Sequence, residues 1–314
     1  MQYTREMLVE VKKQIVEDST TWPLDKQFMP RLVKPDTWAL ACCNPSMDTP
    51  RPHVLVGDEY ALIIDPTDTI CNLRAYVETY ITDKPIKVAA THSHADHTAA
   101  IWQFNDCEVY MSERCWEDIQ MNRINRKHPL GRWHKEDTYI PAIVKPGDTI
   151  DLGNRVIEVV GVNPCHSPSS VLYLDKTYGI LFTGDEIDPG QCNLWNIPVE
   201  TFRDNICMLK RRADEFDIIC APHNGTPMHA KTLDYFLENC DRVMSGIEGD
   251  LDKGSMTYLL NPFEPRSTAT IERRRWDPIV RRSVWKGTAI NYNINLIFNS
   301  QLETYVSDGV NGRP

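Results

Sequence analysis

Short apolar runs bounded by glycine, proline and polar residues alternate with segments of helical periodicity along most of this chain. The runs His53–Val56 and Tyr60–Ile64 flank Gly57-Asp58, which predicts a β-hairpin whose second strand ends at Asp65. Further strands are predicted at residues 86–90, 107–111, 150–152, 155–161, 171–175, 180–182 and 217–220. Helices are predicted at residues 71–82, 98–104, 200–212 and 230–246. Strands that alternate with helices on both halves of the chain indicate an α/β protein with two packed sheets covered by helices.

Three segments depart from this alternation. Residues 1–50 are interrupted by prolines and precede the first predicted hairpin as a lead-in. Leu8, Val11 and Ile15 near its start recur at helical spacing, which predicts an N-terminal surface helix. Residues 112–142 are rich in Trp, Arg, Asn and His and have little periodicity, which indicates an inserted helical cap or a long loop. Residues 267–298 are basic and show the alternation of strands. We therefore predict a main domain over residues 1–254, with the insert at about 112–142, and a strand-rich extension over residues 255–314 for oligomerisation or as a lid.

Composition and charge narrow the class of protein. An apolar fraction of 41% in 314 residues is enough for one large core. The formal net charge of -10 repels phosphate backbones, so nucleic acid is not expected as a partner. The sequence has no run of about 18 apolar residues, so no membrane span is predicted. The first residues lack the apolar core of a signal peptide, and the cysteines include no C-x-x-C pair, so we expect a cytoplasmic protein with reduced thiols.

The strongest chemical signal is the hexapeptide His92-Ser93-His94-Ala95-Asp96-His97, which directly follows the predicted strand 86–90. Alternate positions of an extended segment point to one side, so His92 and His94 can bind one metal ion. Where the chain turns into a helix, Asp96 and His97 can point toward a second ion. A single histidine is more often a core residue than a ligand, but three crowded imidazoles would repel one another or compete for hydrogen bonds without a metal. Imidazole and carboxylate together suit Zn²⁺, Mn²⁺ or Fe²⁺.

Three more residues of these types follow predicted strands in the second half of the chain. His166 lies in NPCHSPSS, Asp185 in FTGDEI and His223 in APHNG, each close to proline or glycine. Ligands gather at this edge of the sheet in layered α/β proteins. Asp185 alone could cap the segment that follows it. Together with the hexapeptide, the three residues predict a metal site.

The motifs HSHADH, PCHSPSS, FTGDEI and APHNG, in this order and approximate spacing, resemble those of the metallo-β-lactamase superfamily. The resemblance extends over residues 53–246 and includes the hairpin that ends in IIDPTD and the turn KPGDTIDLG. It implies the αββα four-layer sandwich of that family, here with a helical insert and a C-terminal extension. The sequence departs from the family at Cys165 and Ser169, where the family often has glycine, and at Asp65-Pro66-Thr67, where it often has Asp-Thr-Gly.

The resemblance also implies two divalent metal ions, Zn²⁺ first, with Mn²⁺ or Fe²⁺ as alternatives. The first ion would be held by His92, His94 and His166. The second would be held by Asp96, His97 and His223, and Asp185 would bridge the two. A bridging water or hydroxide would be the nucleophile, so the predicted catalytic residues are Asp96, which also steers the proton of that water, and Asp185.

These motifs say little about the bond that is cleaved. Enzymes with this bridging aspartate include lactonases, thioesterases similar to glyoxalase II, sulfatases and phosphodiesterases. Asp185 disfavours a true β-lactamase, and the sequence has no clear counterpart of the glutathione-binding helices of glyoxalase II. We predict a hydrolase of a small-molecule ester or lactone. A thioesterase or amide hydrolase, a phosphodiesterase or sulfatase, a di-iron redox enzyme and a non-catalytic binding module stay open as alternatives.

Seven residues are candidates for the substrate pocket: Trp102, Trp116, Trp133, His134, Tyr139, Asn193 and Trp195. Each of the aromatic residues could equally belong to the core. Glu186, beside Asp185, could act as a general acid, but we expect it to point away from the metals, because neighbours on an extended segment face opposite sides. The strand-like C-terminal segment could pair with a second copy of the chain, so we also expect a homodimer.

Overall fold

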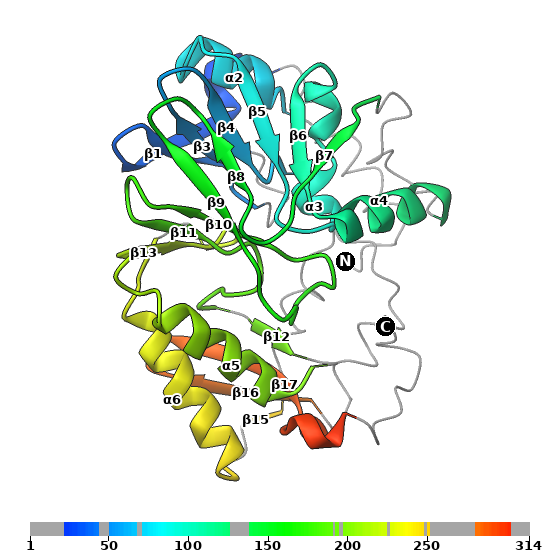
Figure 1. Cartoon of the computed structure of the whole chain (residues 1–314), viewed down its shortest axis with the longest axis vertical. Coiled ribbons are helices and arrows are strands. Elements are labelled where there is room, and N and C mark those ends of the chain that lie inside the picture. Colours follow the sequence, from blue (N-terminus) through cyan, green and yellow to red (C-terminus); the bar gives the residue numbers. More distant parts are fainter. Residues whose placement is uncertain are drawn as a thin grey trace, which may run out of the picture.

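The computed structural model describes residues 22–43, 50–67, 71–125, 138–190, 192–194, 197–224, 227–247, 250–251 and 280–302. Two β-sheets pack face to face, and helices cover their outer faces (Figure 1). The α/β sandwich expected from the sequence is therefore confirmed. None of the helices in these residues has the length and apolar character that crossing a membrane requires.

The first sheet has seven strands in chain order from β1 to β7. It begins with antiparallel hairpins and becomes parallel from β4 onward. Its strands are β1 (Phe28–Lys34), β2 (Thr37–Cys42), β3 (His53–Val56), β4 (Ala61–Ile64), β5 (Ile86–Ala89), β6 (Glu108–Met111) and β7 (Pro141–Ile143). Its helical segments are η1 (Leu24–Lys26), α2 (Leu73–Tyr80), α3 (Ala95–Thr98), η2 (Ile101–Phe104) and α4 (Glu113–Asn125). Helix α2 begins where the Asn72 side chain accepts a hydrogen bond from the backbone N–H of Ala75 at 3.0 Å.

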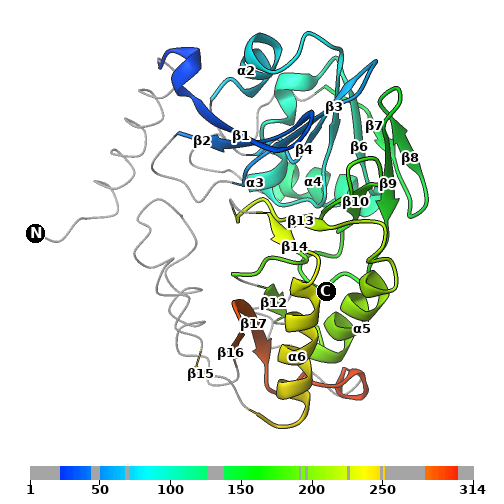
Figure 2. The same ribbon diagram turned by 90° about the vertical axis from the view of Figure 1, so that its left-hand side faces the viewer.

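The second sheet has the strand order β14-β13-β11-β10-β9-β8. Its strands are β8 (Thr149–Asp151), β9 (Val156–Val160), β10 (Leu172–Asp175), β11 (Ile180–Phe182), β13 (Ile218–Cys220) and β14 (Met228–His229). Helices α5 (Val199–Lys210) and α6 (Thr232–Met244) lie side by side against it (Figure 2). These helices match the helices predicted at residues 200–212 and 230–246 to within about two residues, the usual uncertainty of helix ends.

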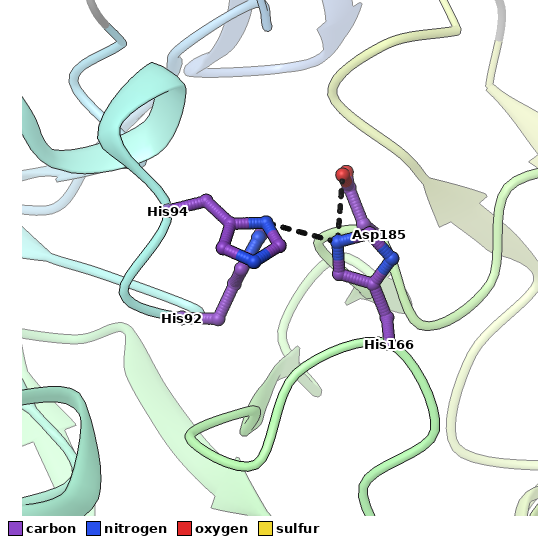
Figure 3. Close-up of side chains that lie close together, drawn as sticks. All are labelled: His92, His94, His166 and Asp185. Carbon is purple, nitrogen blue, oxygen red and sulfur yellow. Dashed lines mark hydrogen bonds and ion pairs between the residues drawn. The ribbon is translucent and has the colours of Figure 1, made fainter. Parts of the chain in front are cut away.

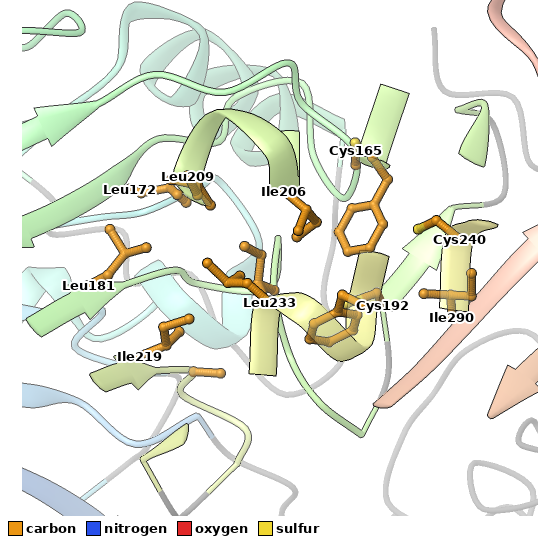
Figure 4. Close-up of a cluster of buried hydrophobic side chains, with 14 of the residues drawn as sticks. Cys165, Leu172, Leu181, Cys192, Ile206, Leu209, Ile219, Leu233, Cys240 and Ile290 are labelled. Carbon is orange, nitrogen blue, oxygen red and sulfur yellow. The ribbon is translucent and has the colours of Figure 1, made fainter. Parts of the chain in front are cut away.

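Successive side chains of a strand point to opposite faces of its sheet, and this alternation explains why the fold has four layers. On the first sheet, Leu55 and Leu62 belong to the core between the sheets, whereas Val54 and Ile63 belong to the core beneath the helices. Both sets are fully buried, so these strands are apolar on both faces, as a sheet covered on both sides requires. A third core joins the second sheet to α5 and α6 (Figure 4).

A third sheet, in the order β12-β17-β16-β15, lies beside α6. Its strands are β12 (Cys192–Leu194), β17 (Thr288–Asn293), β16 (Val280–Trp285) and β15 (Asp250–Leu251), and η3 (Asn299–Gln301) follows them. The buried amide of Asn239 on α6 donates to the Ser283 carbonyl at 3.1 Å, which attaches the hairpin β16–β17 to the helix. The predicted extension therefore does contain strands, but they share a sheet with β12, which precedes residue 254. The division of the chain at that residue stays a prediction.

The segment predicted as an insert contains elements of the first sheet. Cys115 and Ile119 of α4 are fully buried in the core of that sheet, and β7 is its edge strand, parallel to β6. Residues 126–137 of this segment and the predicted N-terminal helix lie outside the described residues. The lead-in contains a hairpin, β1–β2, that the sequence analysis did not predict.

Hydrogen bonds join the two halves of the sandwich next to the end of β5. The hydroxyl of Tyr173 donates to the Ala90 carbonyl at 3.0 Å, and the N–H of Val171 donates to the Thr91 carbonyl at 2.9 Å. These bonds fix the chain that leaves β5 against the second sheet, which is where the hexapeptide begins.

Candidate metal centre

The hexapeptide is held from behind by Asp65, at the end of β4. The Asp65 carboxylate accepts hydrogen bonds from the Thr91 N–H at 2.7 Å and from the Thr91 hydroxyl at 2.8 Å. It also lies 3.0 Å from Nδ1 of His97, and the Thr91 hydroxyl lies 3.1 Å from Nδ1 of His92. With both Nδ1 atoms engaged, the Nε2 atoms of His92 and His97 are the ones that face the site. Such partners orient imidazole ligands and set their tautomers.

The second half of the chain provides its residues from loops that follow strands. His166 lies between β9 and β10, Asp185 follows β11, and His223 follows β13. The buried carboxylate of Glu186 accepts hydrogen bonds from the backbone N–H groups of Cys165 and His166 at 2.9 and 3.0 Å. The Glu186 carboxylate therefore binds the backbone of the His166 loop, and among the described residues it is not part of either group of metal-ligand atoms.

Gly184 allows the Asp185 loop to approach the hexapeptide. Its φ is 52°, in the left-handed region, and a Cβ atom there would lie 2.4 Å from the Thr91 hydroxyl oxygen. A side chain at this position would thus push Asp185 away from the histidines.

The first group of ligand atoms comes from His92, His94, His166 and Asp185, which point toward one another in Figure 3. One donor atom from each lies within 4.8 Å of all the others. Nε2 of His166 is 3.1 Å from Nδ1 of His94 and 3.4 Å from Oδ2 of Asp185. The structure therefore brings together three imidazoles and one carboxylate that the sequence places up to 93 residues apart.

The second group comes from Asp96, His97 and His223, again within 4.8 Å of one another. Oδ2 of Asp96 lies 3.4 Å from Nε2 of His223 and 3.7 Å from Nε2 of His97. Asp185 also reaches this group, because its oxygens lie 3.5 Å from Nε2 of His97 and 3.4 Å from Nε2 of His223. One carboxylate thus lies between both groups.

These donors fit divalent metal ions. Ligand atoms about 2.0–2.2 Å from a tetrahedral Zn²⁺ are about 3.3–3.6 Å apart, close to the separations of 3.4–3.5 Å between imidazole nitrogens and carboxylate oxygens in this site. Among the buried side-chain atoms of the described residues, Nε2 of His92, Nε2 of His97 and Oδ1 of Asp185 form no hydrogen bond. A buried polar atom that forms no hydrogen bond costs about 1–3 kcal/mol, which a metal ion would offset. The geometry is compatible with all seven predicted ligands.

Electrostatics keep most of these residues in the form that binds metals. Burial, together with the neighbouring imidazoles, lowers the pKa of His92 well below its usual value and that of His94 to about 3, so both are neutral. Burial alone would raise the pKa of Asp185, but the nearby His223 and His97 hold it well below its usual range. The carboxylates in turn raise the pKa of His97 to about 10, against the effect of burial. Without a metal, a proton on His97 balances carboxylate charge that a divalent cation would neutralise instead.

The residues predicted to line the substrate pocket occupy different places. Tyr139 is buried in the core of the first sheet, and Trp116 on α4 packs edge-on against it at 5.7 Å between ring centroids, which favours a core role for both. Trp102 is partly buried on η2. Asn193 on β12 accepts a hydrogen bond from the Asn291 amide at 2.8 Å. Trp133, His134 and Trp195 lie outside the described residues, so a substrate role for this set stays a prediction.

Two residues that hold the ligands in place, Asp65 and Arg51, were not among the predicted site residues. Asp65 was recognised only as a strand end, although the parallel pairing of β4 with β5 makes its proximity to Thr91 understandable. Arg51 precedes β3, and its guanidinium donates to the carbonyl of His223 at 2.9 Å, while its N–H donates to the Pro222 carbonyl at 2.9 Å. Because Arg51 lies 172 residues from His223, no local pattern could have revealed this contact.

Comparison with known proteins agrees with this arrangement. A family model described as the metallo-beta-lactamase superfamily matches residues 53–206. The human protein named acyl-coenzyme A thioesterase MBLAC2 is 25% identical over 209 residues, which cover 61% of this chain and 71% of that protein. The Bacillus subtilis protein named "Probable metallo-hydrolase YqgX" is 27% identical over 147 residues, which cover 44% of this chain and 66% of that protein.

Solved structures share the fold at low sequence identity. A metallo-beta-lactamase from Pontibacter korlensis has a TM-score of 0.52 and 19% identity, covering 68% of this chain and 98% of its own. The stereoselective inverting sec-alkylsulfatase Pisa1 from Pseudomonas sp. has a TM-score of 0.51 and 15% identity, covering 74% of this chain and 43% of its own. At these identities the likeness shows the fold alone.

Proposed function

Because this chain has the metallo-β-lactamase fold and matches that superfamily's model over residues 53–206, we propose that it is a dinuclear metal-dependent hydrolase of carboxylic esters. The bond would be an oxygen ester, a lactone or a thioester of a small molecule. The observation that most strongly supports a dinuclear site is the position of Asp185, whose carboxylate lies 3.4–3.5 Å from imidazoles of both ligand groups. A thioester is included because the MBLAC2 relatives are named acyl-coenzyme A thioesterases.

The residues divide the work as follows in this proposal. His92, His94 and His166 would hold one ion, Asp96, His97 and His223 would hold the other, and Asp185 would contact both. When bound, two divalent ions supply Lewis acidity that lowers the pKa of water and polarises a carbonyl group. The Asp96 carboxylate, which is about one-third exposed, would accept a hydrogen bond from the attacking water and orient it. Water adds to the carbonyl carbon, the bond to the alcohol or thiol breaks, and the leaving group takes up a proton.

The test is a proton-release assay with Zn²⁺- and Mn²⁺-loaded protein on esters, lactones, thioesters, amides, phosphodiesters and sulfate esters. Cleavage confined to carboxylic esters or thioesters, and reduced at least about 100-fold in Asp185→Asn, is the expected result. The matched control is Asp217→Asn, because Asp217 is a surface residue paired with Lys34. Cleavage of only phosphodiesters or sulfate esters would contradict the bond class. Full activity in Asp185→Asn would contradict the shared carboxylate.

A further inference from the structure

A chain of buried serine hydroxyls joins the two loops that provide the imidazoles of the first ligand group. Ser93 lies between His92 and His94, and Ser167 directly follows His166. Between them, the hydroxyl of Ser169 lies 3.1 Å from the Ser93 hydroxyl and 2.9 Å from the Ser167 hydroxyl. It also accepts a hydrogen bond from the Ser93 N–H at 3.0 Å.

The hydroxyls of this chain have a fixed direction. The Ser93 hydroxyl donates to Oδ2 of Asp118, on α4, at 3.3 Å, and a carboxylate can only accept. Ser93 must therefore accept from Ser169, and Ser169 must accept from Ser167. All three serines are no more than 3% exposed, so water does not compete for these bonds. The orientation of each hydroxyl thus follows from the carboxylate on α4.

The same loops belong to opposite halves of the sandwich, so their spacing depends on contacts between the halves. The Ser112 hydroxyl, at the start of α4, donates a hydrogen bond to the Ser169 carbonyl at 2.7 Å. The backbone of Ser169 is therefore held by α4 in addition to its side chain. The separation of 3.1 Å between His94 and His166 requires the two loops to keep this register.

We propose that Ser169 is a positioning residue for the first ligand group, and that its hydroxyl sets the position of His166 relative to the loop of His92 and His94. Asp118 fixes the direction of the hydroxyl chain and so couples α4 to the metal site. This inference rests on the proposed metal-binding function. It goes beyond that function because Ser169 and Asp118, which are not among the proposed ligands, would control how tightly one ion binds.

The experiment loads the full chain with ¹¹³Cd²⁺ and compares the wild type with Ser169→Ala by NMR and by competition with a chelator. Loss of the hydroxyl leaves the Ser93 N–H without its acceptor, so Cd²⁺ affinity at the three-imidazole group is expected to fall about 10–100-fold. The ¹¹³Cd resonance of the ion at that group should shift or broaden, while the ¹¹³Cd resonance of the ion at Asp96, His97 and His223 should keep its position and width. The matched control is Ser170→Ala, a buried serine of the same loop that is not part of the hydroxyl chain.

If Ser169→Ala binds Cd²⁺ at each of the two groups with an affinity within about twofold of the wild type, the inference is overturned while the proposed function stands. If Ser169→Ala does not fold, Asp118→Leu removes the terminal acceptor from outside the ligand loops. This variant is expected to lower Cd²⁺ affinity only at the group of His92, His94 and His166. An unchanged Cd²⁺ affinity at that group would overturn the inference equally. A wild type that binds no Cd²⁺ would overturn both this inference and the proposed function.

Discussion

Replacing Asp65 with asparagine tests how the outer contacts of the ligands control the metal site. The Asp65 oxygen Oδ2 accepts from the Thr91 hydroxyl and lies 3.0 Å from Nδ1 of His97. An amide NH₂ in that place donates a hydrogen bond, so Nδ1 of His97 has to become the acceptor. The ring then holds its proton on Nε2, the atom that lies 3.5 Å from Asp185 and faces the site. His97 could not bind a metal in this tautomer.

The size of the effect is estimated from the loss of Asp65 as an outer partner of the ligand His97. Outer partners of metal ligands typically contribute 10–100-fold to metal affinity, which is about 1.4–2.7 kcal/mol. We therefore expect one ion to bind about 10–100-fold more weakly in Asp65→Asn, while the ion of His92, His94 and His166 is retained. Chelator competition and metal analysis after dialysis measure this, with thermal unfolding as the check of the fold. The control is Asp58→Asn, an exposed residue on the β3–β4 turn. If Asp65→Asn binds two ions with affinities within about twofold of the wild type, Asp65 does not control the tautomer of His97.

Three further outcomes are expected. Arg51→Met removes the donor to the His223 carbonyl and should weaken one ion about 10-fold or more in the same titration, whereas Arg51→Lys should restore part of the loss. Gly184→Ala should lower metal affinity and the melting temperature together, because the new Cβ meets Thr91 at 2.4 Å; an unchanged melting temperature would argue against it. Burial, aided by Arg51, lowers the pKa of His53 to about 3 in the folded protein, so below pH 6.5 the unfolded state takes up a proton that the folded state does not. The stability contributed by neutral His53 is therefore complete above pH 6.5 and falls by about 1.4 kcal/mol per pH unit below it. Urea unfolding at pH 7.5 and pH 5 should show that the difference in unfolding free energy between the wild type and His53→Gln is smaller at pH 5.

Local signals in the sequence predicted much of the fold. The runs that form β3, β4 and β5 are short, apolar and bounded by turn residues, so both their length and the residues at their ends indicated strands. The hairpin β1–β2 was missed because its first strand contains Pro30, and four of its seven residues are exposed. Strand β12 has only three residues and forms through pairing with β17, about 100 residues later, which no local pattern shows.

The candidate site was predictable to the extent that its residues follow strands. His92, His94, Asp96 and His97 lie within one hexapeptide, and the structure shows the other three predicted ligands beside them. The residues that hold the ligands were less visible, since Asp65 and Ser169 act through contacts between segments distant in the sequence. Glu186 was expected to point away from the site, and its bonds to the His166 loop agree with that.

The most direct test of a shared dinuclear centre is anomalous X-ray diffraction from crystals of the Zn²⁺-loaded protein, recorded at the zinc absorption edge. We expect two peaks about 3.5–4 Å apart, one beside His92, His94 and His166 and the other beside Asp96, His97 and His223, with the Asp185 carboxylate between them. A single peak, or zinc bound away from Asp185, would contradict a shared dinuclear centre.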